Sequence, residues 1–267
     1  MGKELISNTI DLYYFTGTGN TLLVARRMVE VFEQNGRIVN LHRIENSDPS
    51  AVDLSHVIGL AFPVAAQSTF PLVWDFARTL PDADGTKIFM VDTVSIFSGA
   101  IVGPLKRVLV KKGYRPIGAK EITMPGNWFP GKVNKDRNQR TVARGLERAS
   151  VYAGRLVDGT SHWLRVPVLS DAFYWLNSRP IVWRKLAEIG EKYRVDREAC
   201  NGCGYCEKLC PVGNIGYDEY PSFGPACQQC MRCIAFCPRE AISVPGKKYE
   251  LYRAVKIKDL LGEWQND

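Results

Sequence analysis

The eight cysteines constrain this chain more than any other feature, because all of them lie within residues 200–237 of a 267-residue sequence. They form two runs, in which successive cysteines are separated by two, two and three residues and a proline follows the fourth. The second run repeats the first at an offset of 27 residues. The runs are Cys200, Cys203, Cys206 and Cys210, and Cys227, Cys230, Cys233 and Cys237. We therefore predict a small duplicated module, built on cysteine and joined to a larger part that has none.

Iron–sulfur clusters, zinc and disulfides are the three chemistries that compete for such runs. Zinc sites typically use two separated cysteine pairs rather than four cysteines within eleven residues. Disulfides are rare in the reducing cytosol, which we expect here because no secretory signal is visible. In the iron–sulfur pattern, three closely spaced thiolates hold one [4Fe–4S] cluster and the fourth holds the other. The predicted metal ligands are Cys200, Cys203, Cys206 and Cys237 for one cluster, and Cys210, Cys227, Cys230 and Cys233 for the second.

Residues 191–246 resemble the bacterial-type ferredoxins that carry two clusters, with both cysteine motifs complete. The resemblance implies a compact α+β duplication and one-electron transfer at low potential. Tyr193 and Tyr217 are expected to pack over the clusters, although ordinary core packing explains them equally well. We take residues 191–250 as this domain and residues 251–267 as a charged tail.

The first part of the chain alternates between strand and helix patterns. Strands are expected at residues 9–15, 37–42, 56–62, 87–92 and 115–122, and helices at residues 22–34, 70–79, 99–111 and 136–157. Several strands are continuously apolar, as strands buried on both faces should be. Strands that alternate with helices predict an α/β domain with a parallel sheet covered on both faces, over residues 1–160.

The turn after the first strand has the composition of a phosphate-binding loop. Its residues are Thr16, Gly17, Thr18, Gly19, Asn20 and Thr21. Backbone N–H groups at a helix N-terminus bind anions, and threonine hydroxyls add donors. A Walker A loop is excluded because its lysine is missing, and a dinucleotide fingerprint is disfavoured because Leu22 stands where a glycine is needed.

This loop resembles the phosphate loop of the flavodoxin family, whose fixed positions are matched by Thr16, Thr18, Gly19 and Thr21. The resemblance covers roughly residues 5–160. It implies a five-stranded parallel sheet in the order 2-1-3-4-5, with FMN bound outside strands 1 and 3. The flavin ring would then contact the loops after the third, fourth and fifth strands. The candidate residues are Pro63, Val64 and Ala65, then Thr93, Val94, Ser95 and Gly99, and then Trp128. Neither of the first two loops has the usual tyrosine, and Trp128 and Phe129 could equally form an ordinary packed loop.

Residues 161–190 form an aromatic-rich connector with three tryptophans, Trp163, Trp175 and Trp183. We expect Pro180 to kink or break any helix there. The favoured interpretation is a packed connector, and an aromatic path for electrons is the alternative.

The chain carries a formal charge of +7 and has a pI of about 9.0. Residues 191–267 hold 11 basic and 11 acidic residues, so the excess lies in residues 1–190. Anionic clusters and a phosphate ester would offset this charge. Nucleic-acid binding is disfavoured, because the basic residues look scattered along the sequence. No stretch is apolar enough to span a membrane, and a cytoplasmic location is expected.

Together these patterns resemble a flavodoxin–ferredoxin fusion, a family found mostly in anaerobes. The resemblance implies FMN and two [4Fe–4S] clusters that couple one-electron and two-electron steps for a redox partner protein. A flavin-dependent reductase of a small molecule and, less favoured, a redox sensor are the alternatives. The sequence names no catalytic residue, and it leaves the partner's identity and a homodimer open. The three histidines, His42, His56 and His162, form no hydrolytic site, and structural roles are expected for His42 and His56.

Overall fold

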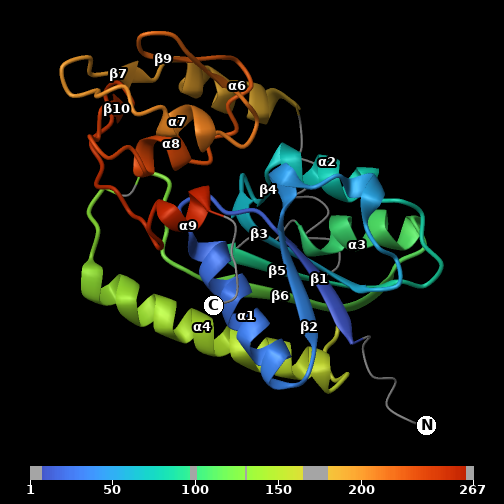
Figure 1. Cartoon of the computed structure of the whole chain (residues 1–267). Coiled ribbons are helices and arrows are strands. Elements are labelled where there is room, and N and C mark those ends of the chain that lie inside the picture. Colours follow the sequence, from blue (N-terminus) through green and yellow to red (C-terminus); the bar gives the residue numbers. More distant parts are fainter. Residues whose placement is uncertain (1–7, 97–100, 130, 165–179, 263–267) are drawn as a thin grey trace. The chain divides into compact units, whose positions relative to one another are not determined.

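The computed structural model describes residues 8–96, 101–129, 131–164 and 180–262. The predicted flavin residue Gly99 and the connector residue Trp175 lie outside the described residues. By its contacts, the chain forms two compact units (Figure 1). The first contains residues 1–16, 20–125 and 136–178, and the second contains residues 17–19, 126–135 and 179–267.

A parallel sheet forms the centre of the first unit. Its strands are β1 (Thr9–Tyr14), β2 (Ile38–Arg43), β3 (Val57–Ala65), β5 (Lys87–Val94) and β6 (Arg115–Thr123), and a two-residue strand β4 (Ser68–Thr69) pairs antiparallel with β3. The five parallel strands follow the order β2-β1-β3-β5-β6. In order of appearance this is 2-1-3-4-5 once β4 is set aside, so the predicted α/β fold and strand order are confirmed.

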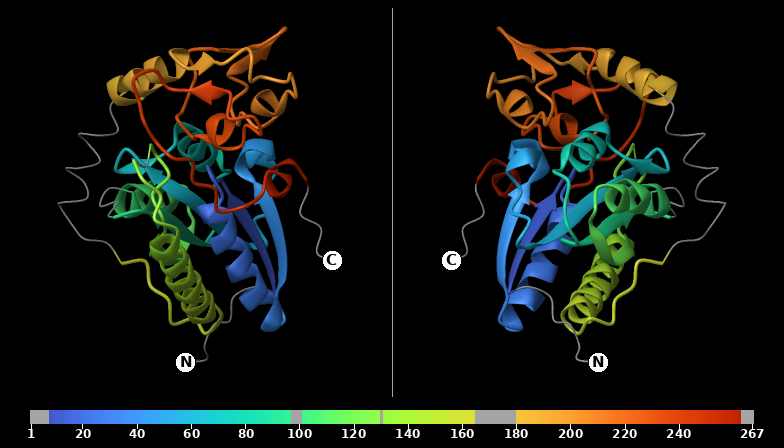
Figure 2. Two further views of the ribbon diagram at one scale, coloured as in Figure 1. Left: turned by 90° about the vertical axis from the view of Figure 1, so that its left-hand side faces the viewer. Right: turned by 90° about the vertical axis from the view of Figure 1, so that its right-hand side faces the viewer.

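Helices cover both faces of this sheet. They are α1 (Asn20–Gln34), α2 (Pro71–Thr79), α3 (Val102–Lys111) and α4 (Lys135–Val157), with short 3₁₀ turns η1 (Ile44–Asn46) and η2 (Pro49–Ala51). Phe89 of β5 packs against Phe32 of α1 and Tyr152 of α4, with ring centroids 5.9 Å and 6.4 Å away. Helices α1 and α4 therefore share one face, and α2 and α3 lie on the other (Figures 1 and 2). None of the helices in the described part of the chain combines the length and the apolar character that crossing a membrane requires.

The second unit consists of short elements. They are α6 (Pro180–Glu191), β7 (Arg194–Val195), α7 (Tyr205–Lys208), β8 (Ile215–Tyr217), β9 (Pro221–Phe223), α8 (Arg232–Ala235), β10 (Ile242–Ser243) and α9 (Lys258–Leu261). Helix α6 begins at Pro180, and the residues immediately before it lie outside the described ones, so the expectation that Pro180 kinks or breaks a helix stays a prediction. Proline fits the first helical position, where its missing N–H would have had no partner.

The 27-residue sequence repeat is also a repeat of the backbone. Helix α7 maps onto α8, and the strand pair β7 and β8 maps onto β9 and β10. Three left-handed positions recur at the same offset: Gly202, Gly204 and Gly213 in the first copy, and Gln229, Met231 and Glu240 in the second. A non-glycine residue in this conformation costs of order 1 kcal/mol, so the second copy keeps the turns of the first at some cost.

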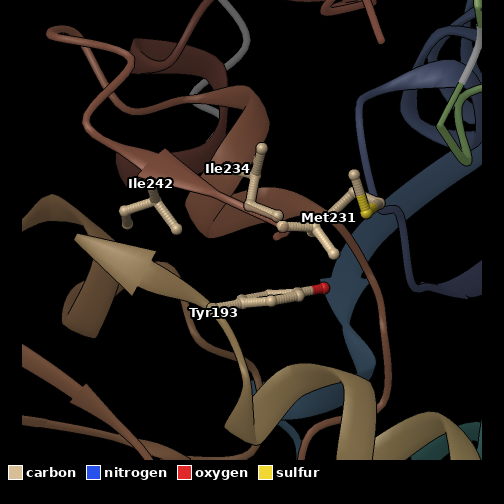
Figure 3. Packing of buried hydrophobic residues seen from close by; sticks show 5 residues of the cluster. Tyr193, Met231, Ile234 and Ile242 are labelled. Atoms are coloured by element: carbon tan, nitrogen blue, oxygen red, sulfur yellow. The ribbon is translucent and has the colours of Figure 1, made fainter. Parts of the chain in front are cut away.

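The two copies pair with each other rather than within themselves. Strand β7 pairs antiparallel with β10, and β8 pairs antiparallel with β9. Between them lies a small core of Tyr193, Met231, Ile234, Ile242 and Val244, of which the first four are labelled in Figure 3. Cys206, Cys227 and Cys233 are among the half-buried residues packed against it. The core of this unit is thus built around its thiols.

Candidate cluster and flavin sites

The thiols of the second unit line two separate cavities. Cys200, Cys203 and Cys206 line the first together with Cys237 from the second run. Cys227, Cys230 and Cys233 line the other together with Cys210 from the first run. These are the two crossed sets predicted from the spacing. Tyr217 lines the first cavity and Tyr193 lines the second.

The fourth thiol of each cavity comes from a cysteine just after a short helix: Cys210 follows α7, and Cys237 follows α8. The N–H of Asn214 donates to Cys210 Sγ at 3.2 Å, and the N–H of Ala241 donates to Cys237 Sγ at 3.3 Å. These two bonds are equivalent under the 27-residue offset. The N–H and the side-chain amide of Gln229 both donate to Cys227 Sγ at 3.5 Å. Such donors stabilise thiolate and cluster charge, so the surroundings of the sulfurs fit an anionic iron–sulfur group.

The thiols are strongly disfavoured as isolated anions. Burial raises the pKa of Cys206 to about 11 and the pKa of Cys230 to about 12, and it raises that of Cys233 well above the ordinary value. Neighbouring thiolates add to these increases. Ligation to a metal removes thiol protons and supplies the missing positive charge. Within the described ranges, no three Cys, His, Asp or Glu side chains are arranged to hold one metal ion. The thiols instead line cavities, as the ligands of a group larger than a single metal ion must.

One cavity-lining residue was not anticipated from the sequence. Arg232 is only 4% exposed, lines the cavity of the second set and donates from Nη1 to the carbonyl oxygen of Leu209 at 3.4 Å. Its positive charge opposes the increase in the pKa of Cys230 that burial causes. The equivalent position in the first copy, 27 residues earlier, is Tyr205, which lines the other cavity. The two cavities are therefore electrostatically unequal.

The predicted phosphate loop lies between β1 and α1. Thr16, Thr18, Asn20 and Thr21 are all buried. Gly19 has a φ of 108°, which only glycine adopts readily. The first turn of α1 contains no acidic residue, so the positive end of this 15-residue helix is not neutralised by its own side chains. The loop therefore fits an anion such as a phosphate ester.

Hydrogen bonds connect the phosphate loop with two of the other predicted loops. The hydroxyls of Thr21 and Thr93 lie 2.8 Å apart. Asn20 Nδ2 donates to the carbonyl oxygen of Pro125 at 2.8 Å. Within the second unit, Asn127 Nδ2 donates to Thr18 Oγ1 at 2.8 Å. Asn127 precedes the predicted Trp128, and its amide was not assigned this role from the sequence.

The candidate flavin-ring residues are less closely organised. Pro63, Val64 and Ala65 end β3 and are half-buried, Val94 is buried, and Ser95 is exposed. The turn after Ala65 consists of Ala66 and Gln67, with φ of 48° and 61°. Two left-handed residues form the tight turn that usually carries Asn-Gly, so this hairpin is strained where the flavin is expected.

The two aromatic residues of the third loop, Trp128 and Phe129, differ in their exposure and packing. Trp128 is 55% exposed. Phe129 packs between Trp128 and Tyr249, with ring centroids 5.4 Å and 5.2 Å away. Phe129 therefore has a packing role within the second unit, whereas the exposed Trp128 is still available for a ligand or a partner.

His42 and His56 lie around a buried carboxylate. His56 Nδ1 and Asp11 Oδ2 are 2.9 Å apart, and Asn40 Nδ2 donates to Asp11 Oδ1 at 2.7 Å. Burial acts to raise the pKa of Asp11, but hydrogen bonds from His42, Asn40 and His56 outweigh it and lower the pKa to about 2. These contacts support the structural role expected for both histidines.

A second buried carboxyl group, that of Asp92, lacks hydrogen bonds of this kind among the described residues. Asp92 of β5 is completely buried, and neither of its oxygens has a hydrogen-bond partner in the described part of the chain. Burial, and then the charge of Glu121 on the neighbouring strand, raise its pKa well above the ordinary value. Burial therefore favours the protonated form of Asp92, which lies next to the predicted site residue Thr93.

The family model described as "4Fe-4S binding domain" matches residues 193–216. The chain is 39% identical to an uncharacterized ferredoxin of Methanocaldococcus jannaschii, over 21% of this chain and 86% of the relative. It is 35% identical to a ferredoxin-like protein in the vnf region of Azotobacter vinelandii, over 16% of this chain and 78% of the relative. Among solved structures, a flavodoxin of Streptococcus pneumonia matches with 16% identity and a TM-score of 0.41, over 55% of this chain and 97% of that one.

Proposed function

Because the chain belongs to the ferredoxins through its cysteine-rich part and carries a flavodoxin-like unit before it, we propose that it moves electrons between two [4Fe–4S] clusters and FMN on behalf of a partner protein. The observation that carries this proposal is the pair of cavities, each lined by three thiols of one run and the fourth thiol of the other. Electron transfer is the activity common to both parts.

The chain's own residues supply ligation, charge balance and exclusion of water. Cys200, Cys203, Cys206 and Cys237 would hold one cluster, and Cys210, Cys227, Cys230 and Cys233 would hold the other. The N–H groups of Asn214 and Ala241 would stabilise the sulfur that completes each set. Bound clusters supply one-electron transfer, and their hydrogen bonds and burial set the potential.

The phosphate loop would hold FMN by its phosphate ester. Thr16, Thr18 and Thr21 provide hydroxyls, and the start of α1 provides backbone N–H groups. Bound FMN supplies chemistry with one or two electrons. A flavin joined to one-electron centres matches a two-electron process to one-electron carriers, and this coupling is the proposed advantage of having both parts in one chain.

A small-molecule reductase is the second candidate. Trp128, a large apolar side chain with 55% exposure in a predicted flavin loop, favours it because a substrate could stack there. Steady oxidation of a small donor by the purified protein, without an added protein, would support the reductase and contradict the carrier. The cytoplasmic location expected from the sequence stays a prediction.

The ligation is tested by pairs of cysteine substitutions in the full-length protein reconstituted without oxygen. We expect about eight irons and one FMN per chain before substitution. In the crossed arrangement Cys203→Ser and Cys237→Ser remove ligands from the same cluster, so their combination keeps about four irons. The combination of Cys230→Ser and Cys237→Ser affects both clusters and keeps almost none. Reversed iron contents would refute the crossed ligation, and the absence of FMN or iron from the unsubstituted protein would refute the proposed function.

A further inference from the structure

A basic groove lies on the outer surface of the first unit, between helix α4 and strand β6. It has a volume of about 340 Å³. The residues that line it are Lys120 of β6 and Arg144, Glu147, Arg148, Val151, Tyr152 and Arg155 of α4. Four cations and one carboxylate give this groove a formal charge of +3.

The helical period brings these residues together. Arg144 and Arg148 are four positions apart, and Arg155 follows seven positions later, so the three project from one face of α4. The opposite face is buried against the sheet through residues such as Ala149, Ala153 and Leu156. The sequence interpretation of scattered basic residues is wrong at this face, because it ignored the phase of the helix.

The positive charges of the groove are not paired with anionic groups in the described part of the chain. In the described ranges, the charged groups of Lys120, Arg144, Arg148 and Arg155 form no hydrogen bond or ion pair. By contrast, Arg27 pairs with Glu30 at 2.9 Å and Arg253 pairs with Glu240 at 3.1 Å elsewhere in the chain. Four cations that converge around a single carboxylate repel one another, and a bound anionic surface reduces this repulsion.

We propose that this groove docks an acidic surface of a partner protein. The inference rests on the proposed function, which requires such a partner. Charge complementarity sets the class of the partner and speeds its encounter through electrostatic steering.

The lining favours a protein over other anions. Arg144, Arg148 and Arg155 are exposed, so the groove is a surface feature and does not enclose a small ligand. Val151 is 52% exposed among the cations and offers an apolar contact, as mixed protein interfaces do. Tyr152 is too buried to stack on a base, as a nucleic-acid ligand would need.

The test measures binding of an acidic probe to the full-length protein with its cofactors. The probe is a 20-residue polyglutamate peptide, compared with a 20-residue polyglutamine peptide and a 20-nucleotide single-stranded DNA. The groove variant carries Arg144→Glu, Arg148→Glu and Arg155→Glu. A matched variant carries Lys111→Glu, Lys247→Glu and Lys248→Glu, which makes the same change of net charge at exposed sites elsewhere.

We expect the polyglutamate Kd to rise at least about tenfold in the groove variant and less than about twofold in the matched variant, and to rise with salt. Equal weakening in both variants would refute a specific groove, and tighter binding of the DNA would refute a protein partner. Arginine-to-glutamine versions repeat the measurement if the charge reversals unfold the protein. Iron and FMN contents are measured on the same samples, so that loss of the cofactors, which counts against the proposed function, is distinguished from loss of docking alone.

Discussion

The difference between Arg232 and Tyr205 predicts that the two proposed clusters have different reduction potentials. Reduction adds negative charge to a cluster, and a buried guanidinium beside it stabilises that charge. Arg232 lines the cavity of the second cysteine set, which consists of Cys210, Cys227, Cys230 and Cys233. Tyr205 occupies the equivalent position at the other cavity. We therefore expect the second cluster to have the higher potential and to lose this advantage in Arg232→Gln.

The magnitude follows from Coulomb's law. We take a separation of roughly 6–8 Å between the Arg232 guanidinium and the centre of the bound group as the working assumption. With an effective dielectric constant of about 20, one unit charge at that distance contributes about 2–3 kcal/mol. For a one-electron step this corresponds to about 90–120 mV, since a tenfold change in equilibrium constant is about 59 mV.

The assay is an EPR-monitored redox titration of protein with its cofactors bound. Cys203→Ser is present in every sample, so that only the second cluster remains to be titrated. Arg232→Gln should lower its potential by about 90–120 mV, and Arg232→Lys should stay near the original value because the charge is kept. The control is Tyr205→Gln, which makes an equivalent change at the other cavity and should leave the potential unchanged.

Two results would contradict this reasoning. A shift of less than about 20 mV in Arg232→Gln would mean that the guanidinium charge is screened from the cluster. An equal shift in Arg232→Lys would mean that hydrogen bonding, such as that to the Leu209 carbonyl, and not charge, sets the potential.

Three further substitutions test the first unit by urea unfolding. Asp92 keeps its proton in the folded state above the pH at which the unfolded chain loses it, so stability should fall by about 1.4 kcal/mol per pH unit from about pH 4 up to its raised pKa. Asp92→Asn should abolish this slope, and an unchanged slope would contradict the burial of a neutral acid. Gly154→Ala in the interior of α4, where an added methyl group meets nothing within 4 Å, should stabilise the protein by about 0.5–1 kcal/mol, and destabilisation would disprove open space there. Gly59→Ala should destabilise by about 1–3 kcal/mol because its methyl group would overlap the ring of Phe89, and a neutral effect would show that this ring can move.

The features that the sequence predicted well depend on local spacing. The cysteine spacing, interpreted as the iron–sulfur pattern, anticipated which thiols line the same cavity, since a tight loop presents its three successive sulfurs to one centre. The alternation of strands and helices predicted a parallel sheet, and the order of its strands was implied by the resemblance of the phosphate loop to that of the flavodoxin family.

The features that the sequence missed depend on partners distant in the chain. Arg232 looks like an ordinary charged residue between two cysteines, and only the fold shows that it is buried. Asp92 ends the strand predicted at residues 87–92, and only the fold shows that its carboxyl oxygens have no hydrogen-bond partner among the described residues. The groove on α4 is different, because its periodicity is readable in the sequence once the bounds of the helix are known.

The pairing of β7 with β10 and of β8 with β9 means that neither 27-residue copy is complete without the other. Each copy brings only three of the four thiols of its own cavity and lacks a partner for both of its strands. An ancestor with a single copy would have worked as a symmetric pair of identical peptides, assembled only at sufficient concentration. Joining the copies in one chain made that assembly independent of concentration. It also allowed the two copies to diverge in sequence, so that one site could acquire an arginine where the other has a tyrosine.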